Sequence, residues 1–378
     1  MGLHLIIHAF LRWVETAKAS DRARAAKALA KAYCSSEMTG EDRRAAEMAM
    51  IFLLDDPAPK VRLALAEALA DFADAPRTVV LPLAEDQVEI AAQPILRSPV
   101  LTDGDLVDIA ARGSAITRSL IAHRSFVSRA VSAALAEIGG TCEVMALLEN
   151  PGAVLSRRSL KRIAERLGDE AAVRDLLLDR DDLPSDARHA LVEKVGAALA
   201  GFELIRAAVG EGRVERITRE ACEMATIGMT ADVEPSDMPA LAEHLRVAGR
   251  LTPAFLMHVL CAGRIEFFAA TIVNLSGQAE KRVRSILADG REAAVRSLFE
   301  AAGLGRDVSG LFADATMMWR REAKRGSSGM SVSLRLLARA RDAAGTSSEA
   351  MIDLVEKMTI AEQRQSARHY ALTAAAAA

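Results

Sequence analysis

The sequence predicts an all-α protein: an α-solenoid of stacked helix pairs, followed by a second helical region. Hydrophobic residues make up 51% of the 378 residues but aromatic residues only 4%, so Ala, Leu, Val, Ile and Met carry the apolar content. These residue types suit close packing between helices. Long alternating runs of Val, Ile, Thr and Tyr, which indicate strands, are missing from the sequence. A turn followed by an amphipathic helix recurs through the first half of the chain, as in a helical repeat.

The stretch from Leu53 to Ala73 is the clearest copy of this segment. Its prolines end one helix and begin the next, because proline lacks the amide hydrogen that a helix interior needs but fits a first turn. On a helical wheel, two apolar faces flank a narrow charged stripe. The first face holds Val61, Leu65, Ala68, Leu69 and Phe72, the second Leu63, Ala66 and Ala70, and the stripe Lys60, Glu67 and Asp71. A helix with two apolar faces needs neighbours on two sides, which a stack supplies.

Similar segments recur at intervals of roughly 30 residues. They begin at Leu53, Leu83, Ala110, Leu147 and Leu177. Each consists of a helix end, a polar or acidic turn and a second amphipathic helix. Local signals support the helix starts, among them a capping box from Thr102 to Asp105 and a proline at position 184.

Glycine-rich stretches suggest further divisions of the chain. Four glycines between Val195 and Val214 indicate the end of the repeats, and the sequence RGSSGMS at 325–331 indicates a short linker. We therefore predict N-terminal capping helices at 1–40, helical repeats at 41–200, a second helical domain at 201–325, and a linker with C-terminal helices at 326–378.

Two patterns resemble known families. Asp56, Val61 and Arg62 form an Asp-x-x-x-x-Val-Arg pattern similar to the signature of HEAT-type repeats. The run from Phe10 to about Phe202, together with LTPAFLMHVLCAGRIEFFAA from Leu251, resembles an uncharacterised bacterial family, domain of unknown function 2336. Its most specific pieces are LLDDPAPKVRLALAEALAD, LRSPVLTDGDLV and LLENPGA, whereas the irregular third repeat has Arg112 where other copies have an acid. The resemblance implies a HEAT-like helical fold in a bacterial cytoplasm, and it implies no catalytic residue.

The charge balance argues against a strong overall attraction to nucleic acid or anionic membranes. The chain has 48 basic and 51 acidic residues, so any such patch must be local. Two Arg-rich helical regions are the local candidates, and HEAT-like stacks can cradle duplexes, so nucleic-acid binding is the alternative function. The first candidate is the helices around Arg112, Arg118, Arg124 and Arg129, and the second is the helices around Arg157, Arg158, Lys161, Arg162 and Arg166.

The sequence predicts a cytoplasmic protein with no transmembrane segment. The apolar run in MGLHLIIHAFLRWVE is too short to span a bilayer, which takes about 20 residues, and it lacks the features of a signal peptide. The four cysteines form no C-x-x-C pair and have no histidine at a zinc spacing, which favours reduced thiols. They are Cys34, Cys142, Cys222 and Cys261.

No residue set predicts a catalytic, cofactor or metal site, and we expect no enzyme. His4 and His8 share one helix face but have no obvious third ligand. Gly303-Leu-Gly305 lacks the third glycine and the preceding strand of a dinucleotide site, and Walker and nucleophile-elbow motifs are absent. An enzyme would instead need a deep polar pocket near Gly201 to Gly212.

Three residue sets allow a binding interpretation beside a structural one. They are the recurring acids Asp55, Asp56, Glu85, Asp86, Asp179, Asp181 and Asp182; the segment Met317, Met318, Trp319, Arg320, Arg321, Lys324 and Arg325; and the methionines Met224, Met229, Met238 and Met257. Acids in turns also cap helices, basic residues also favour helix C-termini, and methionines also fill cores. The extended helical surface favours a non-enzymatic scaffold that binds another protein, whose identity the sequence does not give.

Overall fold

The computed structural model describes residues 12–325, 332–342 and 352–360, together with residues 349, 363 and 367. His4, His8 and residues 326–331 of the predicted linker lie outside these residues. The described chain is all-α, as predicted: helices follow one another without a strand, apart from one isolated bridge between Val127 and Ala153. It forms two compact units, Met1–Leu183 and Pro184–Ala378.

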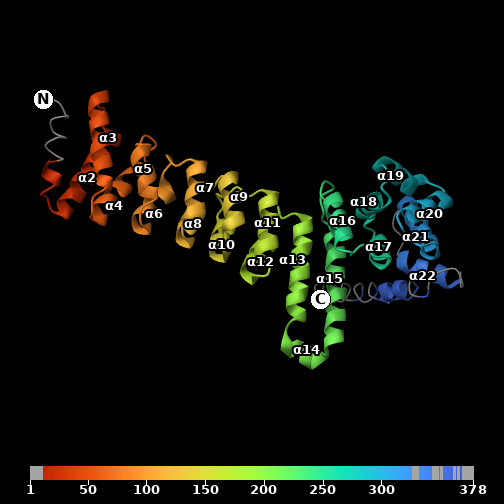
Figure 1. Ribbon diagram of the computed structural model, residues 1–378. Coiled ribbons are helices and arrows are strands. Elements are labelled where there is room, and N and C mark those ends of the chain that lie inside the picture. Colours follow the sequence, from red (N-terminus) through yellow and green to blue (C-terminus); the bar gives the residue numbers. More distant parts are fainter. Residues whose placement is uncertain are drawn as a thin grey trace, which may run out of the picture. The chain divides into compact units, whose positions relative to one another are not determined.

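The helices of the first unit form two layers (Figure 1). One layer contains α2 (Ala19–Ser35), α4 (Pro59–Leu69), α6 (Val88–Arg97), α8 (Ala115–Ala122), α10 (Thr141–Glu149) and α12 (Ala171–Leu178), each packed on the next. The other contains α3 (Gly40–Leu54) packed on α5 (Arg77–Ala84), and α7 (Asp103–Arg112), α9 (Arg129–Ile138) and α11 (Arg157–Leu167) packed in order. A helix such as α4 therefore has neighbours on both sides within its layer, α2 and α6, and two more in the other layer, α3 and α5.

Helix α4 shows how the sequence pattern becomes packing. Pro59 occupies its first turn, and Val61, Leu65 and Leu69 are fully or almost fully buried in the core of the unit. Phe72, predicted on the same buried face, is 38% exposed. The helix ends at Leu69, so Phe72 follows in the turn and no longer points along the buried face.

The local capping signals behave as predicted. Thr102 and Asp105 form a reciprocal capping box at the start of α7, with the Thr102 amide donating to Asp105 at 2.8 Å. Pro184 lies immediately before the first residue of α13. Such caps satisfy amides that have no partner within the first helical turn.

The second unit begins with a helical hairpin. Helices α13 (Ser185–Ala200) and α15 (Glu211–Met229) pack against each other, and the short α14 (Glu203–Val209) connects them (Figure 1). The named helices that follow are α16 (Met238–Val247), α17 (Pro253–Cys261), α18 (Ile265–Ser276), α19 (Glu280–Asp289), α20 (Glu292–Ala301), α21 (Arg306–Arg325) and α22 (Val332–Asp342). The described residues 352–360 are helical as well. The core of these helices contains Phe268, Phe299 and Phe312, whose ring centroids lie 5.7 to 6.2 Å apart.

The division between the units falls earlier in the chain than the predicted boundary at 200 and 201. Gly196 does not interrupt a helix there: it is buried inside α13, where a Cβ would collide with the Cys222 sulfur of α15. This glycine permits close approach of two helices. Gly201 and Gly210 flank α14 at the exposed end of the hairpin, so the stretch is a connection within the second unit.

Candidate functional site

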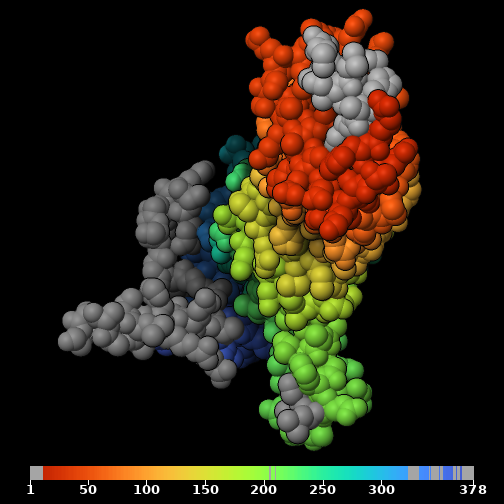
Figure 2. Space-filling view, turned by 90° about the vertical axis from the view of Figure 1, so that its left-hand side faces the viewer, coloured from red at the N-terminus to blue at the C-terminus, as the bar shows by residue number. Residues whose placement is uncertain are grey.

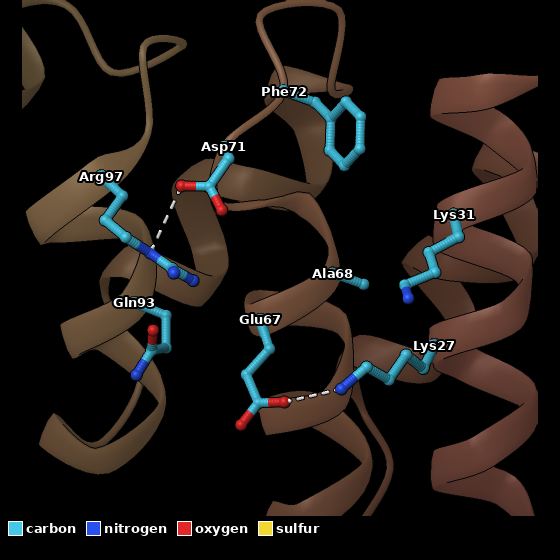
Figure 3. Close-up of a pocket in the computed structure, with 8 residues that line it drawn as sticks. All are labelled: Lys27, Lys31, Glu67, Ala68, Asp71, Phe72, Gln93 and Arg97. Carbon is cyan, nitrogen blue, oxygen red and sulfur yellow. Dashed lines mark hydrogen bonds and ion pairs between the residues drawn. The ribbon is translucent and has the colours of Figure 1, made fainter.

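A groove of about 430 Å³ opens on the first unit across three neighbouring helices of one layer (Figure 3). Helix α2 contributes Lys27 and Lys31, α4 and the turn after it contribute Glu67, Ala68, Asp71 and Phe72, and α6 contributes Gln93 and Arg97. The groove therefore exists only because α2, α4 and α6 stack side by side.

The charges of the groove alternate from helix to helix. Lys27 and Lys31 are one turn apart on α2, and Glu67 and Asp71 are four positions apart at α4. Like charges at this spacing destabilise an isolated helix by roughly 0.2–0.5 kcal/mol. In the stack they meet opposite charges: Lys27 Nζ lies 3.1 Å from Glu67 Oε2, and Arg97 Nε lies 3.5 Å from Asp71 Oδ1. Exposed pairs of this kind contribute at most about 1 kcal/mol each, so they mainly set the charge pattern of the groove.

One cation of the groove, Lys31, lacks among the described residues the ion pair that Lys27 and Arg97 have, and the aromatic ring of Phe72 lines the same groove. Lys31 points into the groove from α2 and forms no ion pair with a described residue (Figure 3). The Phe72 ring and Ala68 line the same groove. The site thus combines one excess positive charge with an exposed aromatic surface, which suits a ligand carrying an acidic group next to an apolar one.

The recurring acids have mostly structural roles. Asp56 accepts two hydrogen bonds from Arg22, and Asp86 accepts two from Arg62. The hydrogen bond from Arg22 lowers the pKa of Asp56 below its ordinary value. Elsewhere, Arg112 donates to Glu85 at 2.6 Å, and Arg180 pairs with Asp182 at 2.8 Å. The exposed acids Asp55, Asp179 and Asp181 complete the set.

Arginines of the first Arg-rich helix pair also contact the protein itself. Arg124 donates to the carbonyl oxygens of Ile95 and Ser98 at the end of α6, the latter at 2.8 Å. Arg118 donates to the Gly113 carbonyl at 2.9 Å and to buried Glu143. Arg129 is exposed at the start of α9.

The second Arg-rich helix, α11, repeats this arrangement. Arg166 donates to the carbonyl oxygens of Ala136 and Gly139 at the end of α9, at 2.6 and 3.1 Å. Arg162 forms a bidentate pair with Glu137, at 2.7 and 2.8 Å. Arg158 is exposed, as are Arg157 and Lys161, which have further contacts of their own. Guanidinium groups at helix ends neutralise the partial negative charge of the terminal carbonyls, so these arginines join neighbouring repeats.

Two members of the aromatic and basic cluster on α21, Trp319 and Arg320, also bond to their own unit, whereas Arg321 is exposed. The Trp319 indole donates to the Leu260 carbonyl at 2.6 Å, and its ring covers Gly263. Arg320 donates to the carbonyl oxygens of Ile286, Leu287 and Gly290 at the end of α19. Of the four methionines singled out, Met238 and Met257 are buried and Met229 is partly buried, whereas Met224 is exposed.

Sequence reasoning identified the charged stripe of Glu67 and Asp71 but missed the groove that they line. The available signal was the pair of lysines one turn apart on α2, opposite two acids at the same spacing, Glu67 on α4 and Asp71 in the turn after it. In the described part of the chain, no three His, Cys, Asp or Glu side chains are arranged to hold a metal ion.

A family model described as "Uncharacterised protein conserved in bacteria (DUF2336)" matches residues 90–354. The chain belongs to this family. The DUF2336 match begins within α6, so Gln93 and Arg97 of the groove fall inside it and the other six lining residues precede it. No match to the chain was found among curated proteins or among solved structures. Every helix of the described residues is too short or too polar to cross a membrane.

Proposed function

We propose that this chain is a non-enzymatic helical scaffold of the bacterial cytoplasm that binds a protein partner in the groove over α2, α4 and α6. The observation that carries the proposal is the position of the uncommitted Lys31 ammonium in one groove with the exposed Phe72 ring. A cytoplasmic location fits the cysteines, which all lie in the described chain and form no disulfide.

The groove favours a particular partner chemistry. A carboxylate of the partner can pair with Lys31, while an adjacent apolar side chain covers Phe72 and excludes water from that pair. The carboxylates of Glu67 and Asp71 lie in the same groove and repel a ligand with a dense negative charge. The partner segment is therefore one acidic residue close to a large apolar residue, rather than an acidic run.

The same acids make nucleic acid the weaker alternative. A phosphate backbone would pass Glu67 and Asp71 at the groove, and the arginines that could attract it elsewhere, such as Arg124 and Arg166, are engaged by backbone carbonyls. The exposed basic side chains of Arg129, Arg157, Arg158 and Lys161 are the remaining support for nucleic-acid binding.

A peptide-binding assay tests the proposal. An array of labelled peptides presents Asp or Glu at each spacing from Leu or Phe, and fluorescence polarisation measures binding to the full chain. We expect Lys31→Glu and Phe72→Ala each to raise the dissociation constant of the selected peptide by about tenfold or more, as for anchor residues of an interface. Lys60→Glu is the matched control, because Lys60 is an exposed lysine of α4 outside the groove.

Three results would contradict the proposal. They are an array in which no peptide binds above background, Lys31 and Phe72 variants that bind as well as the unaltered chain, and a Lys60→Glu variant that weakens binding equally. A duplex that binds with a steep salt dependence, and that Lys31→Glu does not affect, would favour the nucleic-acid alternative instead.

A further inference from the structure

The α13–α15 hairpin of the second unit exposes large apolar side chains along its length. Leu199 is 49% exposed, Phe202 57%, Ile217 48% and Met224 45%. In Figure 2 the end of the hairpin, in bright green, is open at the surface. A cluster of large apolar side chains left in water usually marks an interaction site, whereas single exposed apolar residues need no explanation.

These residues follow helical spacing on both helices. On α13 and just beyond it, Val192, Val195, Leu199 and Phe202 are separated by three or four positions, and on α15 the same is true of Ile217, Ala221, Met224 and Gly228. Such spacing places each set along one face of its helix.

Both faces turn to the same side of the hairpin. The close approach of Gly196 to Cys222 fixes which sides of α13 and α15 face each other. Counting about 100° per residue from that contact, and allowing for the antiparallel course of the helices, brings the two apolar stripes together on one surface. We call this surface the hairpin face.

The other side of α13 is covered by its own unit. His189 and Glu193 of α13 contact His244 and Arg250, which belong to α16 and the turn after it. The hairpin face points away from this contact, which accounts for the exposure of Leu199 and Ile217 in the described chain.

The charges beside the hairpin face are self-complementary. Arg213 lies four residues before Ile217 and Glu220 three residues after it, on the same edge of the stripe. Neither forms an ion pair with a described residue. Lys357 is paired with Asp353, and its pKa is raised first by that hydrogen bond and also by the charge of Glu220. A partner surface of one charge sign would leave either Arg213 or Glu220 unpaired. An antiparallel second copy instead supplies a Glu220 for each Arg213 and an Arg213 for each Glu220.

We propose that the hairpin face is the homodimer interface of this protein. A two-fold axis beside Ile217 places Arg213 of each copy against Glu220 of the other, because an isologous contact pairs residue i with j and j with i. The four helices, α13 and α15 from each copy, then form an antiparallel bundle with Leu199, Ile217 and Met224 in its seam.

Sedimentation velocity of the full chain tests the proposal. We expect a dimer at micromolar concentration, and a dissociation constant raised by about 100-fold in Ile217→Glu and in Met224→Glu, because each places a charge in the apolar seam. Val247→Glu is the matched control: Val247 is a more exposed apolar residue of the same unit, on α16, and its variant stays dimeric. Circular dichroism verifies that each variant keeps its helix content.

A charge exchange tests the orientation of the two copies without altering the apolar seam. Arg213→Glu weakens the dimer by placing two acids together, and the double variant Arg213→Glu with Glu220→Arg restores it, since the pairs re-form with reversed sign. A monomeric unaltered chain, a dimer that Ile217→Glu and Met224→Glu leave intact, or a double variant that dissociates as much as Arg213→Glu alone would each overturn the proposal.

Discussion

The Arg22 guanidinium donates two hydrogen bonds to the Asp56 carboxylate, from Nε to Oδ2 at 2.7 Å and from Nη2 to Oδ1 at 2.8 Å. Arg22 lies on α2 and Asp56 in the turn before α4. Arg62 on α4 binds Asp86, in the turn before α6, in the same way, and its Nη1 also donates to the Asp56 carbonyl at 2.6 Å. Each arginine thus joins its helix to the turn that begins the next helix of the layer, which fixes the spacing of α2, α4 and α6 beneath the groove.

Replacing Asp56 should destabilise the first unit. Asp56→Ala leaves the mostly buried Arg22 side chain without its partner and removes the acceptor of the Ala58 amide, which Asp56 binds at 2.9 Å. The expected cost is about 1–3 kcal/mol, the penalty for orphaned buried polar groups. Urea unfolding at pH 7 measures it against Asp55→Ala, the exposed neighbouring acid. Equal stability of the two variants would show that the Arg22 pair contributes nothing beyond a surface charge.

Truncation of the α4 core tests the stack directly. Leu65 is fully buried, so Leu65→Ala should reduce the free energy of unfolding by about 2–5 kcal/mol through lost burial and a cavity. Ile116→Ala, in the same unit but on an exposed side chain, should change it by less than about 0.5 kcal/mol. A loss at Leu65 as small as that at Ile116 would mean that α4 does not pack on both of its neighbours.

The helices of this fold could be predicted because their signals are local. Pro59 at a first turn and the capping box of Thr102 with Asp105 depend on residues within a few positions, and two-faced helices such as α4 predict stacking. The prediction that Phe72 lies on the buried face of α4 was wrong, because the exact residue at which a helix ends is set by tertiary packing as much as by sequence.

The groove and the arginine contacts could not be predicted for the opposite reason. Lys27 and Glu67 are 40 residues apart in the chain, so their pairing depends on the register in which α2 and α4 stack. From the sequence, Arg124 is expected to be a solvent-exposed cation. Its hydrogen-bond acceptors are backbone carbonyls, which no pattern of side chains in the sequence reveals. The same holds for Gly196, which looks like a helix breaker but permits a close helix contact.

Arg124 should be required for stability rather than for attraction of a ligand. Arg124→Met keeps an unbranched aliphatic stem but removes the guanidinium group, so it leaves the carbonyl oxygens of Ile95 and Ser98 without this donor. We expect a loss of about 1–3 kcal/mol in unfolding free energy. Arg158→Met, at an exposed arginine of α11, is the control and should be almost neutral. An unchanged stability in Arg124→Met together with weakened duplex binding would reverse this interpretation.

Gly196 should be intolerant of a side chain only while Cys222 faces it. Gly196→Ala places a methyl group against the Cys222 sulfur and 3.1 Å from the Thr218 methyl group, and overpacking of this kind costs about 1–3 kcal/mol. In the double variant with Cys222→Ala the sulfur is gone, so most of the loss should be recovered. A double-mutant cycle from thermal or urea unfolding measures this coupling. Additive effects of the two substitutions would show that the helices do not meet at these residues.

The buried His189 should make the second unit sensitive to acid. Burial, and next the adjacent His244, lower the pKa of His189 to about 4, and the two rings are joined by a hydrogen bond of 3.2 Å between Nδ1 and Nε2. In the unfolded chain the pKa is about 6.5, so the unfolded state takes up a proton first as the pH falls. The contribution of neutral His189 is therefore complete above about pH 6.5 and is lost progressively between pH 6.5 and pH 4.

His189→Gln should remove this dependence, because glutamine stays neutral throughout the range. Urea unfolding at pH 7.5, 6.0 and 5.0 compares the unaltered chain with this variant and with His123→Gln, a substitution at an exposed histidine. The unaltered chain and His123→Gln should lose stability in parallel as the pH falls, whereas His189→Gln should lose less. The nearby Glu193 counteracts the shift by favouring the protonated ring. If all three proteins lose stability equally, the pair of histidines between α13 and α16 does not titrate in this range.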